Sequence, residues 1–233
     1  MPYSFEILDG IAIAFFIIAW VSYNLISARR YSSSGEITLS KLSRNYRKTW
    51  MLNMLDREYR IVDSTLLGTL IQSVSFFTSG TILIIAGLFA ALSSAQEVHG
   101  ITEHIPFAIE TNLVTVKIKF LILIGLFIYI FFKLVWSLRQ YNFAVVMIGG
   151  AKLTFESGQE KNRYAEKLGI ILDRGGVHFN EGMRGYEFGL AYLSWFIHPL
   201  LLIAATTLVV LVIYRREYHS NILRAMQAWD QNK

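Results

Sequence analysis

The sequence predicts an all-α polytopic membrane protein with four transmembrane helices, and three observations lead to this fold class. Hydrophobic residues make up 54% of the 233 residues. They gather in four runs that are long enough to cross a bilayer. A helix needs about 20 residues to do so, because each residue adds about 1.5 Å to its length. The Lys and Arg residues gather in the connections beside these runs, as the positive-inside rule requires of cytoplasmic connections.

The first run covers about residues 7–26 and has only acidic charges, Glu6 and Asp9, at its start. A secretory signal peptide has a basic leading segment and a small-residue cleavage site, and neither is evident here. We therefore expect a retained first span. Because Arg29 and Arg30 follow the run, we expect the N-terminus outside the cell.

The first cytoplasmic connection is expected to cover residues 27–62 and to contain an amphipathic helix. Its hydrophobic residues recur at helical spacing with basic residues between them. Two interpretations fit this pattern: a helix in the lipid headgroup layer, or a helix packed on the rest of the protein. The hydrophobic positions are Leu39, Leu42, Tyr46, Trp50 and Met54.

The second span, about 65–92, contains uncharged polar residues, among them the intramembrane Gln72. Such residues bond to a neighbouring helix or back to the preceding turn. The pairs Ala86 with Ala90 and Gly87 with Ala91 form small-residue faces that allow close helix packing. The following connection has acidic residues and is expected outside.

The third span, about 118–137, is expected to continue as a helix to Ile148, where Gly149 and Gly150 end it. The second cytoplasmic connection covers 138–184. Within it, residues 159–173 show a helical hydrophobic face, and the glycine pair 175–176 is expected to interrupt the helix.

The fourth span is expected at about 185–214, with a close-packing face at Gly185 and Gly189. His198 and Pro199 would lie in mid-membrane, where the proline kinks the helix. Four spans place both termini outside. The tail nevertheless carries Arg215 and Arg216, which conflicts with the positive-inside expectation.

A short internal similarity suggests two related hairpins. Phe15-Phe16-x-x-x-Trp20 in the first span matches Phe131-Phe132-x-x-x-Trp136 in the third. A duplication into two parallel out–in–out hairpins is one explanation. The preference of aromatic residues for the membrane interface is the other.

A group of polar residues is expected at the cytoplasmic ends of the spans. Lys133 near the inner end of the third span can reach water, or pair with Asp63 or Glu187. The group could be a structural network of ion pairs, or a pocket for an anionic headgroup or small anion. Its members are Arg60, Asp63, Lys133, Arg139, Gln140, Asn142, Arg184 and Glu187.

Several kinds of chemistry have no support in the sequence. The chain has no cysteine, which excludes disulfides, thiolate metal sites and a cysteine nucleophile. His198 is the one histidine within a span, so two axial histidines for haem are missing. We expect no cofactor, no metal and no catalytic residue. We also expect no nucleic-acid partner, because the basic residues behind the net charge of +5 lie in the membrane-flanking connections.

The segment FFKLVWSLRQYNFA (131–144) resembles a family of bacterial and plant membrane proteins known as domain of unknown function family 599. WMLNMLDREYRIVD (50–63), FFTSGTILIIAGL (76–88), RGYEFGLAYLSWFIHPL (184–200) and RREYHS (215–220) are similar to it as well. The resemblance implies a four-span membrane fold and supplies no activity. The family-like positions are Arg57, Arg60, Asp63, Lys133, Arg139, Gln140, Asn142, Arg184 and Arg215.

The expected function is that of a non-enzymatic accessory, scaffold or lipid-interacting subunit in the bacterial cytoplasmic membrane. Its expected partners are membrane lipids and either copies of itself or other membrane proteins. The alternative is an oligomeric transporter or channel for small solutes or ions, because four spans alone enclose too little space for a pore.

Overall fold

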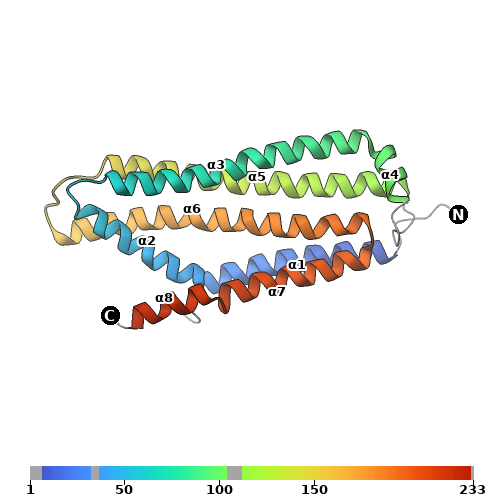
Figure 1. Ribbon diagram of the computed structural model, residues 1–233. Helices are drawn as coiled ribbons and strands as arrows, with labels where there is room; N and C mark the ends of the chain where they lie inside the picture. Colours follow the sequence, from blue (N-terminus) through green and yellow to red (C-terminus); the bar gives the residue numbers. More distant parts are fainter. Residues whose placement is uncertain (1–6, 33–36, 104–111, 232–233) are drawn as a thin grey trace. The chain divides into compact units, whose positions relative to one another are not determined.

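The computed structural model describes residues 7–32, 37–103 and 112–231, and the regular structure of these ranges is helical (Figure 1). Four stretches are long and apolar enough to cross a membrane: Ile7–Tyr31, Ile61–Ser93, Leu113–Gly149 and Pro199–Trp229. The all-α membrane fold class is therefore confirmed. The helices are α1 (Ile7–Ser32), α2 (Leu39–Leu55), α3 (Ile61–Ser93), α4 (Ala95–Glu103), α5 (Leu113–Gly149), α6 (Gly158–Leu193), α7 (Pro199–Tyr218) and α8 (Asn221–Gln231).

The chain forms two compact units. Unit 1 contains Met1–Ser34, Gly80–Phe131 and Met183–Arg216, and unit 2 contains Gly35–Ser79, Phe132–Gly182 and Glu217–Lys233. Helices α3, α5 and α6 contribute residues to both units, whereas α1 belongs to unit 1 and both α2 and α8 belong to unit 2.

The expected fourth span, 185–214, is not one helix. Helix α6 ends at Leu193, a 3₁₀ turn covers Ser194–Phe196, and α7 begins at Pro199 (Figure 1). Proline suits the first position of a helix because that position needs no N–H donor. The chain reverses here, since Arg216 near the end of α7 contacts Glu187 in α6. The proline therefore starts a new antiparallel helix instead of kinking a continuous one.

The end of α6, residues 183–193, contacts all four other helical segments of unit 1 for which contacts are described. Its glycines allow close packing on α5: a Cβ at Gly185 would lie 2.5 Å from Ile130 Cγ1. The Tyr186 hydroxyl lies 2.6 Å from that of Thr81 in α3. The Phe16 ring of α1 packs edge-on against Phe188. The close-packing face predicted for Gly185 and Gly189 is thus used within the chain.

These contacts give the directions of the helices in unit 1. Helix α1 and the end of α6 run antiparallel. Phe16 contacts Phe188, and the earlier residue Asp9 contacts the later residue Trp195. The same holds for α5, where Phe127 lies beside Gly189 and Lys119 beside Trp195. Helices α1, α5 and α7 therefore all run opposite to the end of α6. Their first residues share one end of unit 1, which we call the Asp9 end.

The opposite end of unit 1, which we call the Arg216 end, carries the last turns of α1 and α7. Arg29 and Arg30 lie in the last turn of α1, and Arg215 and Arg216 in that of α7. The tail therefore leaves unit 1 on the same side as the first basic connection. The start of α1 and the end of α7 lie at opposite ends of unit 1, because the end of α6 and α7 are two antiparallel helices and not one.

Unit 2 shows a second difference from expectation. Helix α5 ends at Gly149 as predicted, but α6 continues without a break through the glycine pair 175–176. A Cβ at Gly175 would lie 2.6 Å from Tyr141 Cε1, and one at Gly176 would lie 2.5 Å from the Arg47 guanidinium. The glycines are used for close approach of neighbouring groups, and the helical backbone tolerates them at modest energetic cost.

Helix α2 is packed on the protein. Thr38 caps its start by accepting a hydrogen bond from the Lys41 N–H at 3.3 Å. Leu42, Met51 and Met54 on its hydrophobic side are buried. Of the two interpretations left open by the sequence, this burial favours the helix packed on the protein over a helix inserted in the headgroup layer.

The two aromatic motifs of the suggested repeat lie in unlike surroundings. Phe16 is buried against α6, whereas its counterpart Phe132 is 63% exposed. Matching letters do not mark equivalent packing positions here, so the motifs give no support to the duplication.

Candidate functional site

The eight residues of the expected cytoplasmic polar group are distributed over both units. Arg184 and Glu187 belong to unit 1, and Arg60, Asp63, Lys133, Arg139, Gln140 and Asn142 belong to unit 2. Asp63, Lys133 and Glu187, which the sequence suggested could pair with one another, each contact a different partner.

Asp63 is completely buried in the first turn of α3. Its Oδ1 accepts hydrogen bonds from the Trp50 indole, at 2.7 Å, and from the Arg57 guanidinium. An acidic residue in the first turn also interacts favourably with the helix dipole. Asp63 thus joins the end of α2 to the start of α3.

Arg60, three residues earlier, binds backbone carbonyl groups. Its guanidinium donates to the carbonyls of Ala151, at 3.2 Å, and Lys152, at 3.1 Å. It therefore holds the connection between α5 and α6 beside the start of α3.

Lys133 pairs with Glu181 of α6 at 2.7 Å, and not with Asp63 or Glu187 as expected. The His178 ring lies 3.2 Å from the same carboxylate. Burial would raise the pKa of Glu181, but the hydrogen bonds from His178 and Lys133 outweigh it and lower the pKa to about 2. Glu181 is one turn before Arg184, and the sequence interpretation did not include it.

The remaining unit 2 members lie on the next turns of α5. The Arg139 guanidinium lies over the Trp136 ring, 5.5 Å from its centroid, and near Phe143. Such cation–π contacts orient a side chain that is already near solvent. Gln140 is half-buried and Asn142 is exposed.

In unit 1, Glu187 forms an ion pair with Arg216 at 2.7 Å. This pair joins the end of α6 to α7. The Nε atom of Arg184 is buried and has no hydrogen-bond partner within the described ranges.

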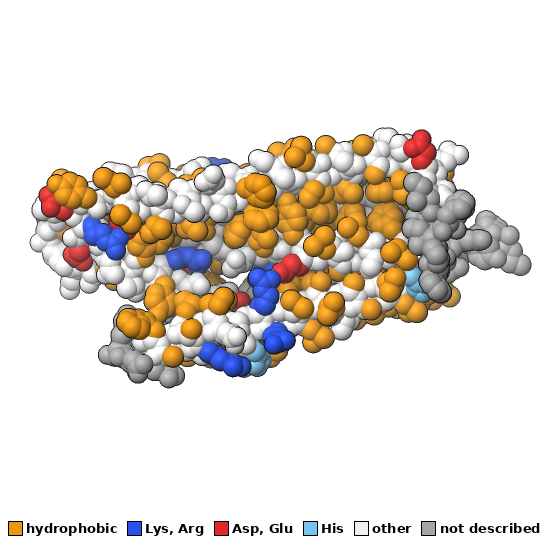
Figure 2. Space-filling model, viewed as in Figure 1, with side chains coloured by type: hydrophobic (Ala, Val, Ile, Leu, Met, Phe, Trp, Pro, Cys, Tyr) orange, Lys and Arg blue, Asp and Glu red, His pale blue; other side chains and the backbone are white. Residues whose placement is uncertain are grey.

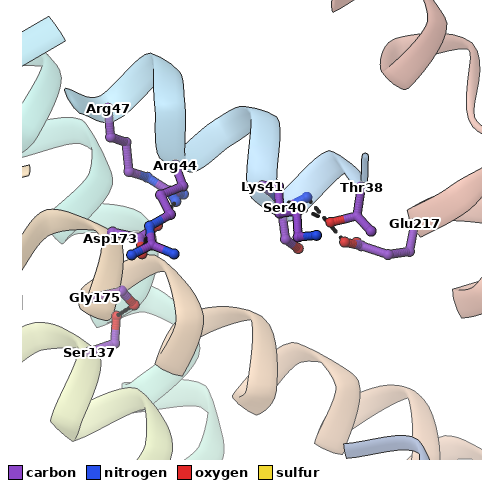
Figure 3. Close-up of polar contacts among 9 residues, drawn as sticks. All are labelled: Thr38, Ser40, Lys41, Arg44, Arg47, Ser137, Asp173, Gly175 and Glu217. Carbon is purple, nitrogen blue, oxygen red and sulfur yellow. Dashed lines mark hydrogen bonds and ion pairs between the residues drawn. The ribbon is translucent and has the colours of Figure 1, made fainter. Parts of the chain in front are cut away.

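A further network joins α2 to α6 in unit 2 (Figure 3). The buried Asp173 accepts a hydrogen bond from Arg47 at 3.1 Å and lies 3.7 Å from Arg44. Next to it, the Ser137 hydroxyl of α5 donates to the Gly175 carbonyl at 2.7 Å. At the other end of α2, the Ser40 N–H donates to Glu217 at 3.1 Å.

An ion pair with both side chains buried lies at the Asp9 end of unit 1, and sequence reasoning missed it. Asp9 and Lys119 are only 5% and 2% exposed. Asp9 Oδ1 accepts from the Trp195 indole at 2.6 Å and lies 3.6 Å from Lys119 Nζ. Lys119 also donates to the Trp195 carbonyl at 2.9 Å.

This group joins three helices where α6 gives way to α7. The Trp195 carbonyl belongs to the 3₁₀ turn, where the regular helical hydrogen bonds end. Lys119 satisfies that carbonyl, and Tyr192 donates to the Lys119 carbonyl at 3.0 Å. A buried charge persists when it is paired and hydrogen-bonded, as both charges are here.

One signal in the sequence could have identified this group. Lys119 is the second residue of the hydrophobic stretch 118–135, and an ionisable residue inside such a stretch needs a partner. The interpretation of that stretch singled out Lys133 alone. Asp9 was used only as an indicator of topology, so the pairing of the two residues was not considered.

The two polar residues expected within the spans lie in different surroundings. Gln72 of α3 is exposed. His198 Nδ1 accepts a hydrogen bond from the Leu200 N–H at 3.0 Å, so it caps the start of α7 at the chain reversal. Its place between two helices corrects the expectation of a histidine in the middle of one span.

Within residues 7–32, 37–103 and 112–231, no three His, Asp or Glu side chains lie close enough together to hold a metal ion. The arrangement of the charged groups described above is suited to joining helices by ion pairs.

A family model described as "Protein of unknown function, DUF599" matches residues 11–222. No curated protein and no solved structure matches the chain. The match covers most of the chain, including α2 to α7 and the start of α8.

Proposed function

Because the chain belongs to the family of proteins of unknown function DUF599, which assigns no activity, we propose a function from the geometry. We propose that it is a non-enzymatic membrane subunit that packs laterally against other membrane proteins or against copies of itself. The observation that carries this proposal is that its buried and half-buried acidic side chains form ion pairs within the protein. Those of Asp9, Asp63, Asp173, Glu181 and Glu187 each contact a basic side chain of their own unit.

The surface of the protein supports this proposal. Figure 2 shows hydrophobic side chains over much of the visible face. Exposed hydrophobic residues include Ile11 and Ile18 of α1 and Leu208 and Leu211 of α7. In a bilayer, such surfaces contact lipid or a neighbouring helix.

The small-residue positions of α3 are the part of this surface best suited to a neighbouring helix. Ala86, Gly87 and Ala90 are exposed, and a Cβ at Gly87 would meet no atom within 4 Å. The glycines of α6 at 185 and 189 already pack against α5. Small residues allow close helix approach in membranes, and the exposed set on α3 leaves room for it.

We propose the orientation from the basic residues of unit 1. Arg29, Arg30, Arg215 and Arg216 gather in the last turns of α1 and α7, at the Arg216 end. The positive-inside rule then places this end in the cytoplasm of a bacterial cell and the start of α1 outside. This orientation removes the conflict over the tail that a four-pass chain creates.

Cross-linking from defined positions tests the proposed function, and the absence of cysteine makes single-cysteine variants straightforward. We would attach a benzophenone maleimide to Gly87→Cys in native membranes, with Leu208→Cys on α7 as the matched exposed control. We expect a discrete protein adduct from position 87 that persists when the membranes are diluted with lipid. A mass of twice the chain would indicate self-association, and another mass a partner subunit.

Two results would contradict the proposal. Lipid adducts alone at both positions would mean that α3 has no protein neighbour. A homo-oligomer that encloses a water-filled path lined by α6 would instead favour the transporter alternative.

A further inference from the structure

Helix α8 carries a hydrophobic stripe on an otherwise polar helix. Ile222, Met226 and Trp229 are spaced by four and three residues, so they share one face. Ile222 and Trp229 are 63% and 62% exposed. Leu223, about 100° around the helix, is buried, and α8 packs on α2. The stripe therefore lies to one side of the contact between α8 and α2, and its Ile222 and Trp229 remain exposed.

Helix α2 provides the contrast within the same unit. Its hydrophobic side is used in packing, since Leu42, Met51, Met54 and Leu55 are buried. The stripe of α8 exposes a tryptophan and an isoleucine instead. Tryptophan is enriched where hydrocarbon meets lipid headgroups, because its ring is apolar and its N–H is polar.

In the sequence, α8 directly follows α7, which is apolar enough to cross a membrane. Helix α7 ends at Tyr218 and α8 begins at Asn221, so only two residues separate them. Arg215 and Arg216 lie in the last turn of α7. Lys and Arg at such a junction are attracted to anionic headgroups.

We propose that α8 is an interfacial anchor: it lies in the headgroup layer of an anionic leaflet, with Ile222 and Trp229 at the boundary of the acyl chains. The stripe is covered by lipid of the membrane that α7 crosses. Helix α2, whose sequence suggested this role, instead supports α8 from the protein side. The inference does not depend on whether the exposed face of α3 has a protein neighbour.

Depth-dependent fluorescence quenching tests the proposal on the full chain. An environment-sensitive dye would be attached to Ile222→Cys, with Arg224→Cys as the matched control on the other side of α8. The protein would be reconstituted in vesicles of phosphatidylcholine with phosphatidylglycerol. We expect headgroup nitroxide lipids to quench the dye at 222, and aqueous iodide to quench the dye at 224.

A comparison of lipids tests the role of charge. Replacing phosphatidylglycerol by phosphatidylcholine should increase iodide access to the dye at 222, and the variant Arg215→Gln should do the same in the anionic vesicles. A contribution of about 1 kcal/mol per basic residue corresponds to about a fivefold change in the buried-to-exposed ratio.

The proposal has two defined failures. Equal iodide quenching at 222 and 224 in anionic vesicles would show that the stripe faces water. A dye at 222 that is shielded in native membranes but open to iodide in the anionic vesicles would show that a protein covers it. Each result overturns the lipid assignment and leaves the cross-linking result at position 87 unaffected.

Discussion

The end of α6 and helix α7 follow one another in the sequence but have different surroundings. Phe188 and Tyr192 of α6 are fully buried, and this segment contacts α1, α3, α5 and α7. Helix α7 buries a narrower line, which includes Leu202 and Thr206, and exposes Leu200, Leu208 and Leu211. The two segments join at a turn, and the sequence predicted a single span, 185–214, for both.

The comparison shows what hydropathy detects. A helix that faces lipid must be apolar around much of its surface, because lipid offers no hydrogen-bond partner. A segment that contacts several helices can carry Tyr186 and Glu187, because Thr81 and Arg216 satisfy them. Hydropathy therefore detects helices with a large apolar surface and gives a weaker signal for a helix that is covered by the others.

The largest expected effect concerns the number of passes. Single cysteines at Tyr59 in the first connection and at His219 after α7 should be protected from a membrane-impermeant maleimide in intact cells. A cysteine at Glu97 in α4 should react. Labelling of the 219 variant in intact cells, with the 59 variant protected, would place residue 219 outside the cell. The chain would then cross the membrane four times, and the end of α6 and α7 would not be separate passes.

The second prediction concerns the buried pair at the turn between these two helices. We expect Lys119→Met to destabilise the protein by about 3–5 kcal/mol, because it leaves Asp9 buried without its cation. The exposed Lys117 on the same helix is the control, and Lys117→Met should change stability by less than about 0.5 kcal/mol. Thermal unfolding in lipid nanodiscs provides the measurement.

The double variant Asp9→Asn with Lys119→Met sharpens this test. It removes both charges, so it should recover part of the loss. An additive loss would show that the two residues act independently.

The third prediction concerns the pH dependence that Glu181 brings to the earlier part of α6. Its pKa is about 2 in the folded protein against 4.5 for the free side chain. Its contribution of about 3 kcal/mol is therefore complete above pH 4.5 and is lost as the pH falls toward 2. Glu181→Gln should flatten the stability profile over this acid range. An unchanged profile would show that the interaction with Lys133 is weak in solution.

The smallest effect compares two glycines. Gly185→Ala places a Cβ 2.5 Å from Ile130 Cγ1 and should destabilise by about 1–3 kcal/mol. Gly87→Ala meets open space and should be neutral or stabilising by up to about 1 kcal/mol, since alanine favours helix. Equal melting temperatures for the two variants would contradict the close packing of α6 on α5.

Helices α2 and α8 repeat the lesson outside the spans. Both are amphipathic in sequence, and α2 was assigned an interfacial role as one of two possibilities. Burial of Met51 and Met54 shows that α2 uses its hydrophobic side in packing, whereas Trp229 of α8 remains exposed. Amphipathicity predicts that a helix has an apolar side and a polar side. It does not say whether lipid or protein covers the apolar one.

The sequence by itself determined the helical class, three of the four hydrophobic spans, the end of α5 at the glycine pair 149–150 and the family. Each of these follows from local properties: the length of an apolar run, a helix-ending glycine and short matched segments. The partners of Lys133 and Lys119 were decided only by the tertiary structure. Lys133 could have met Asp63, Glu187 or Glu181, and Lys119 met Asp9, 110 positions away in the chain. Sequence spacing fixes neighbours along one helix, but the reversal at Ser194–Phe196 determines which helices face each other, and that reversal depends on the packing of all of unit 1.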